Sequence, residues 1–451
     1  MRAWNDILTL AASGRSARGS RRELLDYRDR LLRRIIHHAY EKVPYYRELF
    51  ERAGVVPEDF KTAEDLARIP VTEKRHLRKE PKEQVLAAGK DSKRLFVRTT
   101  TGSTGEPLAV MKTRSDEFLY HVSRLRVMQD LGLRPSDRMA QIGRRSNRQA
   151  PLSWRLIQRF GLFRQDRIYL GDAPDQIADI LQKIKPDIVT GDAAVMDRVS
   201  LELAGRRHDH HLRFVVTGGE MLNTFMRKRI REGFGADVYD TYGSEEMSVI
   251  AWECRKTGLY HVREDNVVAE VLENGRPVKE GERGEVVVTA LLFRAMPFLR
   301  YRLGDEAVKG PDVCPCGKPF STLKEISGRA TDYLRLPDGR EIYAAVVAHI
   351  LQEHITWIER YELVQESRER IVLRIVPLDL PRADVLAMLK DKVAGPLGPG
   401  VDVRIELVSE IQPGPGGKYR VLRSLLGSPY DIKEMDAPAD DSPPRPPRTS
   451  S

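Results

Sequence analysis

The sequence predicts a mixed α/β protein with a large N-terminal domain and a small α+β C-terminal domain. Between about residues 95 and 300, short apolar runs of the β type alternate with longer amphipathic stretches, as in helices packed on largely parallel sheets. Two further β-type runs, Val267 to Leu272 and Gly284 to Leu291, flank a turn-rich segment and predict a β-rich subdomain of antiparallel strands. With 451 residues, 41% of them hydrophobic, the chain can bury a large core.

The N-terminal domain begins with a predicted amphipathic helix. From Arg21 to Tyr40, arginines alternate with leucines and isoleucines at roughly helical spacing. Further along, Leu212 to Thr217 has the pattern of a strand, Met221 to Phe234 that of a helix, and Asp237 to Tyr242 that of the next strand. This order is typical of neighbouring parallel strands joined by a helix.

Beyond residue 332 the pattern predicts a compact α+β unit. Its expected elements are a helix over Ile342 to Glu353, paired strands over Tyr361 to Gln365 and Arg370 to Pro377, a helix over Pro381 to Val393, and a strand over Val401 to Leu407. We therefore expect an N-terminal domain over 1–331, with a basic helical extension over 1–36, and a C-terminal domain over 332–433. Residues 434–451 hold five prolines and four acidic residues without an aliphatic cluster, which predicts a disordered tail.

The chain is basic, with a formal charge of +9, and residues 1–36 alone hold nine arginines against four acidic residues. An arm that binds nucleic acid or a membrane surface would explain this excess, and so would a solvated helical extension. The segment has no recognised nucleic-acid motif, so we expect the extension and no DNA partner. The sequence has no run of about 18 apolar residues, so a membrane span is not expected. Three cysteines are too few for a disulfide framework, which favours a cytoplasmic protein.

The segment from Arg98 to Pro107, Arg-Thr-Thr-Thr-Gly-Ser-Thr-Gly-Glu-Pro, is rich in hydroxyl groups and glycine. Glycines let backbone N–H groups approach oxyanions, and hydroxyls add donors without fixed charge, so the loop is suited to phosphate. It lacks the Gly-Lys-Ser/Thr ending of a Walker loop, which argues against a P-loop NTPase. For such a run alone, an ordinary polar turn remains the alternative.

Two segments follow predicted strands. Gly218-Gly-Glu220 precedes a predicted helix, where a helix start can receive a nucleotide, although a plain strand-to-helix turn would have the same pattern. Asp240-Thr-Tyr-Gly-Ser-Glu-Glu246 ends in paired carboxylates, which could hold a divalent cation or form a solvated acidic loop.

Three shorter segments complete the set. Arg300-Tyr-Arg-Leu-Gly-Asp305 offers a lone aspartate, whose two oxygens can accept hydrogen bonds from two hydroxyls. Gly328-Arg-Ala-Thr-Asp332 offers an arginine followed by a candidate hinge. Gly416-Gly-Lys418 places a lysine on a glycine-rich loop, where a solvated side chain would be the default.

In this order the segments resemble those of the adenylate-forming enzymes, the superfamily of acyl-CoA synthetases. Within it the chain is most similar to the phenylacetate–CoA ligase group and the related capsule-biosynthesis proteins, over roughly residues 35 to 425. The runs Val43 to Gly54 and Leu66 to Lys74 also resemble the N-terminal stretch of phenylacetate–CoA ligases. The resemblance implies that ATP and a carboxylate form an acyl-adenylate and pyrophosphate.

The resemblance also implies residue roles. The implied ATP-binding residues are Thr101, Gly102, Ser103, Thr104 and Gly105 at the pyrophosphate end, Gly219, Glu220, Asp240 and Tyr242 around the adenine, and Asp305 and Arg329 near the ribose and phosphates. The implied catalytic residues are Thr104, Glu246, which would coordinate Mg²⁺, and Lys418, which would bridge the carboxylate and the α-phosphate. Asp332 matches the hinge about which the family's C-terminal domain rotates.

One position departs from the family pattern. Relatives usually carry Ser or Thr just before the metal-binding glutamate, where this chain has Glu245. The added negative charge would either strengthen metal binding or repel the substrate carboxylate and phosphate. The substrate contact at this position is therefore in doubt, while Glu246 still fits the metal role.

The cysteines give a second signal. Cys314-Pro-Cys316-Gly-Lys resembles half of a zinc knuckle, and Cys254 lies seven residues before His261. The four residues would form a closed Cys₃His site, which is typical of structural Zn²⁺. Three buried free thiols and a surface histidine are the alternative.

The function expected from the sequence is that of an AMP-forming acyl- or aryl-CoA ligase, which passes the acyl group to the thiol of CoA or of a carrier protein. In one alternative the acceptor is an amine, a hydroxyl or a carrier protein in a biosynthetic pathway such as that of a polysaccharide. In a second, the chain is a non-catalytic binding protein with an adenylation fold, although Lys418, Glu246, Asp305 and Arg329 are all present. The expected ligands are ATP, Mg²⁺, a carboxylic acid and CoA, with structural Zn²⁺; a homodimer is compatible with the sequence.

Overall fold

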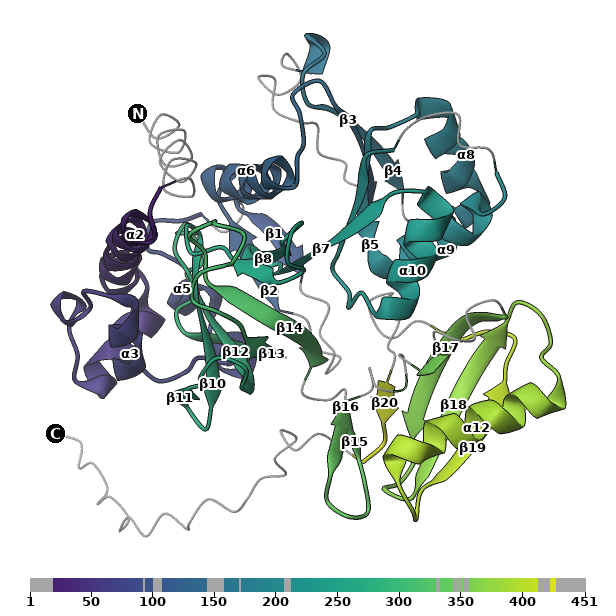
Figure 1. Ribbon diagram of the computed structural model, residues 1–451. Helices are drawn as coiled ribbons and strands as arrows, with labels where there is room; N and C mark the ends of the chain where they lie inside the picture. Colours follow the sequence, from purple (N-terminus) through teal and green to yellow (C-terminus); the bar gives the residue numbers. More distant parts are fainter. Residues whose placement is uncertain are drawn as a thin grey trace, which may run out of the picture.

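A large mixed sheet and a smaller sheet organise the computed structural model of the chain (Figure 1). The structure describes residues 19–91, 94–99, 108–143, 158–169, 172–206, 212–329, 333–343, 347, 350–351, 357–412 and 422–426. The predicted tail over 434–451 lies outside these residues. Within the described ranges, no helix combines the length and the apolar character that crossing a membrane would need.

The large sheet has twelve strands among the described residues. In spatial order they are β11 (Arg276–Pro277), β10 (Val267–Glu273), β12 (Arg283–Ala290), β13 (Tyr301–Lys309), β14 (Thr322–Arg329), β9 (Tyr260–Val262), β8 (Ser248–Glu253), β7 (Asp237–Ser244), β6 (Phe214–Gly218), β5 (Ile188–Asp192), β3 (Arg138–Gly143) and β4 (Arg164–Tyr169). Strands β3 to β7 pair in parallel, and the other pairs are antiparallel. The predicted mixed α/β class is confirmed. The antiparallel share is larger than expected because β8 pairs with β7 and makes the β-rich part continuous with the parallel strands.

Helices cover both faces of the parallel strands. Helices α8 (Pro174–Ile184), α9 (Ala193–Leu203) and α10 (Thr224–Phe234) pack their apolar residues on one face, where Ile177, Met196 and Ile230 are buried. Helix α6 (Arg114–Asp130) packs on the other face through Val127 and Met128. Parallel strands buried on both faces are expected to be continuously apolar, which explains why β6 was recognisable in the sequence.

The basic N-terminal stretch forms helix α2 (Arg21–Lys42), which is followed directly by α3 (Pro44–Ala53). Ser20 and Glu23 close a capping box at the start of α2, and Pro44 begins α3 because its missing N–H is tolerated in a first turn. The apolar side of α2 is buried against the β-rich part of the large sheet; its buried members include Leu31, Leu32, Ile35 and Ile36. The predicted amphipathic helix is therefore part of the main core.

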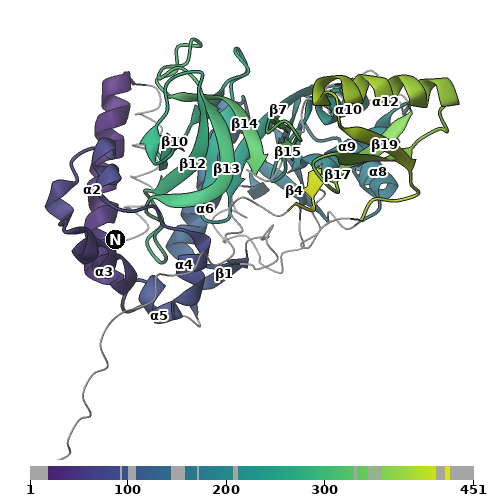
Figure 2. The ribbon, with the colours of Figure 1, turned by 90° about the horizontal axis from the view of Figure 1, so that it is seen from below.

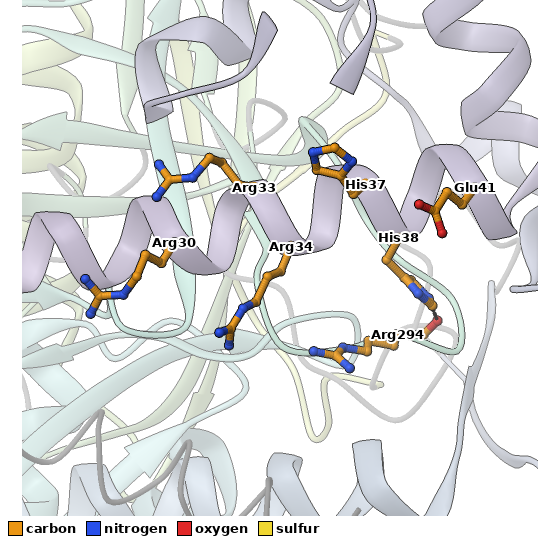
Figure 3. A pocket seen from close by; sticks show the side chains of 7 residues that line it. All are labelled: Arg30, Arg33, Arg34, His37, His38, Glu41 and Arg294. Carbon is orange, nitrogen blue, oxygen red and sulfur yellow. Dashed lines mark hydrogen bonds between the residues drawn. The ribbon is translucent and has the colours of Figure 1, made fainter. Parts of the chain in front are cut away.

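The opposite side of α2 lines an open groove of about 610 Å³. Its lining residues are Arg30, Arg33, Arg34, His37, His38 and Glu41 of the helix and Arg294 from the β-rich part (Figure 3). The Nε2 atom of His38 lies 2.9 Å from the carbonyl oxygen of Arg294 and ties the helix to that loop. No described residue of the predicted reaction site lines this groove.

Short elements connect α3 to the large sheet. They are the 3₁₀ turns η1 (Pro57–Asp59) and η2 (Ala63–Arg68), helices α4 (Lys74–Lys79) and α5 (Lys82–Val85), and the two-stranded sheet of β1 (Phe96–Thr99) and β2 (Ala109–Lys112). Strands β1 and β2 are antiparallel and flank the predicted phosphate loop.

The C-terminal part contains the predicted α+β unit. Its sheet, in spatial order, consists of β19 (Asp402–Leu407), β18 (Arg370–Pro377), β17 (Ile358–Gln365) and β20 (Leu422–Ser424), and helix α12 (Ala383–Leu397) lies across it (Figure 2). The predicted pairing of these two strands is confirmed, and β17 and β18 are antiparallel. The helix predicted from Ile342 is wrong at its start, because Ile342 and Tyr343 belong to strand β16 (Glu341–Tyr343), which pairs with β15 (Tyr333–Arg335). Of the remainder of that predicted helix, the described residues 347, 350 and 351 are helical.

Helix α10 belongs to the large sheet in sequence but also contacts the C-terminal part. Phe225 of α10 is buried in the same apolar cluster as Ile358, Leu363 and Leu389. The guanidinium of Arg229 donates to the carbonyl oxygens of Ile358 and Glu359 at 2.8 and 2.7 Å. Figures 1 and 2 show the C-terminal sheet beside α10, which provides this contact.

Candidate active site

The predicted nucleotide residues begin at the carboxyl ends of three parallel strands. Asp192 at the end of β5 is level with Gly218 of β6, and Gly218 is level with Thr241 of β7. Gly219 therefore lies at the edge where open α/β sheets bind ligands. Its φ of +77° and the 2.9 Å that would separate an added Cβ from Asp192 Oδ1 explain why glycine is needed there.

The side chain of Glu220 lies at the start of a helix. Its Oε2 accepts a hydrogen bond from the backbone N–H of Ala194, in the first turn of α9, at 3.2 Å. A carboxylate at this end of a helix is stabilised by the unpaired N–H groups and the helix dipole. The loop after β6 is thus attached to α9.

Tyr242 and Asp305 come together from β7 and β13. The Tyr242 hydroxyl donates to Asp305 Oδ2 at 2.7 Å. Arg329 of β14 lies opposite Asp305 in the antiparallel ladder. Three residues predicted to contact the nucleotide therefore lie on three strands that reach the same region of the sheet.

Asp240 occupies the interior below Tyr242. Its Oδ1 accepts from Thr217 Oγ1 at 2.8 Å and its Oδ2 accepts from the Tyr260 hydroxyl at 3.0 Å. Burial raises the pKa of Asp240 to about 7, and these two hydrogen bonds oppose the shift. Because both oxygens are used by the protein and the residue is only 8% exposed, its geometry supports a role beneath the site.

Glu246 is held in a turn after β7. The side chain is buried, and its Oε1 accepts a hydrogen bond from the Tyr301 hydroxyl at 3.1 Å. The ammonium of Lys112 donates to the backbone carbonyl of the same residue at 3.3 Å. A carboxylate fixed in this way is a suitable ligand for a hard cation such as Mg²⁺.

Lys112 lies under this turn in an apolar and aromatic environment. Its Nζ atom is 3.8 Å from the centroid of the Phe293 ring and 5.2 Å from that of Tyr120. Burial lowers the pKa of Lys112 to about 8. The ammonium therefore supports the turn from below, on the side away from solvent.

Backbone contacts fix the same turn. The N–H of Met247 donates to Ser244 Oγ at 3.2 Å, and Asn266 Nδ2 donates to the Met247 carbonyl at 3.1 Å. Ser248 follows with a φ of +63°, a conformation that favours glycine and is kept here by the Oγ contact to the carbonyl of Tyr120 at 3.2 Å. Several independent hydrogen bonds thus hold the turn in one conformation, as expected of a segment that positions a ligand.

Thr101, Gly102, Ser103, Thr104, Gly105, Asp332 and Lys418 lie outside the described residues. Of Arg329, only the backbone is described.

Sequence reasoning missed Lys112 and Tyr301 as supports of Glu246. Tyr301 lies four residues before Asp305 on β13, so the motif that contains Asp305 already included it. Lys112 ends β2, which follows the predicted phosphate loop, and a lysine among the apolar residues of a short strand was the available signal.

The Cys and His residues form a compact cluster at the other end of the antiparallel strands. The ligand atoms of Cys254, His261, Cys314 and Cys316 all lie within 4.8 Å of one another. The Sγ of Cys316 is 3.3 Å from Nε2 of His261. In a tetrahedral zinc site with Zn–S bonds of about 2.3 Å, ligand atoms are separated by roughly 3.3 to 3.8 Å, so the donor set fits a single ion.

Tight turns present the thiols. The N–H of Gly258 donates to the Cys254 carbonyl at 2.9 Å, and the N–H of Gly317 donates to the Cys314 carbonyl at 3.1 Å. Burial lowers the pKa of His261 to about 4, so its imidazole is neutral near pH 7, the form that binds a metal. The rings of Trp252 and Phe320 pack near this histidine.

Family models match most of the described chain. The model of the AMP-binding enzymes matches residues 40–291, and that of the CapK C-terminal domain matches residues 334–424. Because the first match spans more than half of the chain, the protein belongs to the AMP-binding enzyme family, and its class is that of the AMP-forming ligases.

Relatives of known name indicate the group within the family to which the chain belongs. The phenylacetate–coenzyme A ligase of Escherichia coli is 26% identical over 90% of this chain and 96% of its own length. That of Thermus thermophilus is 27% identical over 76% and 78%. The protein CapK of Staphylococcus aureus is 26% identical over 53% of each chain. Within the adenylate-forming superfamily, the chain is a member of the phenylacetate–CoA ligase and CapK group.

Solved structures share the fold. 2-Hydroxyisobutyryl-CoA ligase in the postadenylation state, in complex with 2-HIB-AMP, matches with a TM-score of 0.74 and 24% identity over 89% of each chain. The same enzyme in the thioesterification state, in complex with 2-HIB-AMP and CoA, gives a TM-score of 0.59 and 25% identity over 87% of this chain and 88% of that one.

Proposed function

We propose that this AMP-forming ligase uses MgATP to convert a carboxylic acid into an acyl-adenylate and then passes the acyl group to the thiol of coenzyme A. In the first step a carboxylate oxygen bonds to the α-phosphorus as the bond to pyrophosphate breaks. In the second step the thiol sulfur bonds to the acyl carbon as the carbon–oxygen bond to AMP breaks, and the thiol proton is released.

The observation that carries the proposal is a pair of hydrogen bonds between the same two segments. Tyr242 donates to Asp305, and Tyr301 donates to Glu246. One segment thus supplies the residue suited to adenine and the candidate metal ligand, and the other supplies the candidate ribose ligand. These bonds keep a nucleoside-binding carboxylate and a cation-binding carboxylate at a fixed spacing, as joining ATP to a second substrate requires.

Each residue would have a distinct task. The ring of Tyr242 would flank the adenine, and Asp305 would accept hydrogen bonds from the ribose hydroxyls. Glu246 would hold Mg²⁺, which neutralises the charge of the phosphates. Thr101 to Gly105 would surround the departing pyrophosphate, and Lys418 would stabilise the charge that develops between the carboxylate and the α-phosphate.

Coenzyme A is the proposed acceptor because the curated relatives are named phenylacetate–coenzyme A ligases. The match to the CapK C-terminal domain favours a second candidate, transfer to an amine, a hydroxyl or a carrier protein. We further propose that the chain divides into an N-terminal domain over 1–331 and a C-terminal domain over 332–433, with Asp332 as the hinge, and that the Cys₃His cluster holds structural Zn²⁺.

Exchange of labelled pyrophosphate into ATP, measured over a panel of aryl, fatty and amino acids, tests the first step. We expect exchange with at least one acid, and loss of that exchange in Lys418→Ala. Release of AMP with CoA, and not with amines or hydroxyl compounds, would support the proposed acceptor. Absence of exchange with every acid, together with absence of ATP binding by calorimetry, would rule out the proposal.

A further inference from the structure

Arg98, at the start of the predicted phosphate loop, lies between two carboxylates. Its Nε and Nη2 atoms donate to both oxygens of Glu117 at 3.0 and 2.6 Å, and its Nη1 donates to Glu245 Oε2 at 3.2 Å. The guanidinium also lies 4.0 Å from the centroid of the Tyr120 ring. A bidentate bond and a ring contact fix the plane of the group, so the third bond is made in a defined direction.

The second carboxylate belongs to the residue that departs from the family pattern. Glu245 directly precedes Glu246, the candidate metal ligand, in the same turn. The side chain of Glu245 is 38% exposed, whereas those of Arg98 and Glu117 are 20% and 12% exposed. Partly buried charges are weakly screened, so a carboxylate in this position would act on nearby phosphates unless a cation offsets it.

Arg98 also connects two segments that must act together. It belongs to β1, directly before the loop of Thr99 to Gly105, while Glu245 belongs to the turn after β7. Glu117, on α6, anchors the arginine from the far side, and His121 Nε2 lies 3.3 Å from that carboxylate. One arginine therefore fixes the strand that enters the phosphate loop relative to the turn that carries Glu246.

We propose that Arg98 is a positioning residue for the adenylation step: it offsets the charge of Glu245, holds that carboxylate away from the phosphates, and sets the distance between strand β1 and the turn that carries Glu246. This inference rests on the proposed function. It assigns Glu245 no contact with the substrate and explains how the site accepts an acidic residue where relatives carry a hydroxyl.

Removal of either partner has different consequences. In Arg98→Gln, Glu117 and Glu245 lose their shared cation, and the uncompensated charge of Glu245 remains beside the incoming triphosphate. In Glu245→Ser, Arg98 keeps its bidentate bond to Glu117, and the negative charge of Glu245 beside the incoming triphosphate is removed. The double variant removes both the charge and its counterion, so much of the loss should be recovered.

The experiment measures binding of MgATP by calorimetry in the full chain without an acid, and KM for ATP in pyrophosphate exchange. We expect affinity about tenfold weaker in Arg98→Gln, as one unscreened charge produces. Glu245→Ser should bind as tightly as wild type or more tightly, and the double variant within about threefold of wild type. Arg98→Lys should recover part of the affinity, because it restores charge without the bidentate fork. KM should change more than kcat.

Arg138→Gln is the matched control, because Arg138 makes a similar bidentate pair with Asp166 at the far edge of the sheet. It should leave ATP affinity unchanged. A tenfold loss in Glu245→Ser would overturn the inference by making Glu245 a direct ligand, as would equal affinities in all variants or strictly additive losses. Urea unfolding of wild type, Arg98→Gln, Glu245→Ser and the double variant measures the Arg98–Glu245 coupling without nucleotide. Additive changes in the unfolding midpoints would also overturn the inference. If wild type binds no MgATP, the proposed function fails together with this role, whereas the unfolding data still report on the pair.

Discussion

At the scale of single residues, the site depends on hydroxyl groups that orient carboxylates. Tyr242 directs Asp305, Tyr301 directs Glu246, and Tyr260 with Thr217 directs Asp240. A carboxylate rotates less freely when a hydroxyl donates to it, so its position is set before a ligand arrives.

Tyr242→Phe tests the orientation of Asp305. The variant keeps the ring but removes the donor to Oδ2, so ATP affinity should fall by roughly threefold to tenfold, the net value of one hydrogen bond. Calorimetry with MgATP measures the change. The control is Tyr239→Phe, because the hydroxyl of Tyr239 instead accepts a hydrogen bond from Arg255 Nε at 3.2 Å. Equal affinities for the two variants would contradict the role given to the Tyr242 hydroxyl.

Asp240 should make stability depend on pH in a defined direction. Burial raises its pKa from 3.8 to about 7, so between these values the native state keeps a proton that the unfolded chain releases. The free energy of unfolding should therefore fall as pH rises through this window. Asp240→Asn removes the titration, and its stability should decline less than that of wild type between pH 4 and pH 7. Urea unfolding across the pH series measures both curves, and parallel curves would contradict the prediction.

At the scale of elements, helix α2 combines a buried apolar side with a basic exposed side. Ile36 is fully buried, whereas Arg34 is exposed and lines the groove. Ile36→Ala should lower the free energy of unfolding by about 2–5 kcal/mol, because it leaves a cavity in the core. Arg34→Ala, its matched control on the same helix, should change it by about 0.5 kcal/mol or less. Similar small losses in both variants would mean that α2 does not contribute to the core.

The turns that present the Cys and His cluster should depend on a metal. Elemental analysis should find about one zinc per chain, and Cys316→Ser or His261→Gln should lower zinc content and thermal stability together. His121→Gln, on an exposed histidine of α6, is the control and should retain zinc. Protein that is free of zinc and fully stable without any chelator treatment would contradict a structural metal site.

Local patterns predicted the elements well where strands are buried and helices are capped. Strand β18 begins and ends where the alternation of Arg370 to Pro377 predicts it, and α10 starts three residues later than expected because Asn223 accepts from the Met226 N–H as its N-cap. The helix start at Ile342 was wrong because residues 341–343 pair with β15 in a short hairpin, which the helix-like pattern of the segment did not indicate. The position of Glu246 could be predicted from its motif. The contacts of Lys112 and Tyr301 with Glu246 could not be predicted from their local sequence signals alone, since both residues reach it only through the three-dimensional packing of β2 and β13.

At the scale of the whole molecule, helix α10 attaches the C-terminal part to the large sheet. Arg229 is buried, donates to two carbonyls of β17, and has its Nε atom 3.1 Å from Asp197 Oδ1. Removing such a group from its partners would leave a buried charge and unpaired carbonyls. The chain matches the postadenylation structure of the solved ligase with a TM-score of 0.74 and its thioesterification structure with a TM-score of 0.59.

Two substitutions should separate the half-reactions if the C-terminal part rotates. Lys418→Ala should suppress adenylation but leave transfer from chemically made acyl-AMP largely intact, because the lysine would serve only the first step. Asp332→Pro should do the reverse, since proline fixes φ near about −65° and would obstruct a hinge. The two steps are measured separately by pyrophosphate exchange and by thioester formation from acyl-AMP. Equal slowing of both steps in Lys418→Ala, or unchanged transfer in Asp332→Pro, would exclude the two-position mechanism.

Phe225 has a consequence for how the chain behaves as one body. Its ring is 1% exposed, packs edge-on against Tyr361 with centroids 5.9 Å apart, and completes a core otherwise made of C-terminal residues. Undocking the C-terminal part would expose this ring and leave a vacant socket beside Ile358, which costs free energy until another contact replaces it. If the C-terminal part rotates as proposed, its motion would therefore be a switch between discrete docked positions. Melting should likewise be cooperative, since the core of the C-terminal part is incomplete without Phe225 of α10.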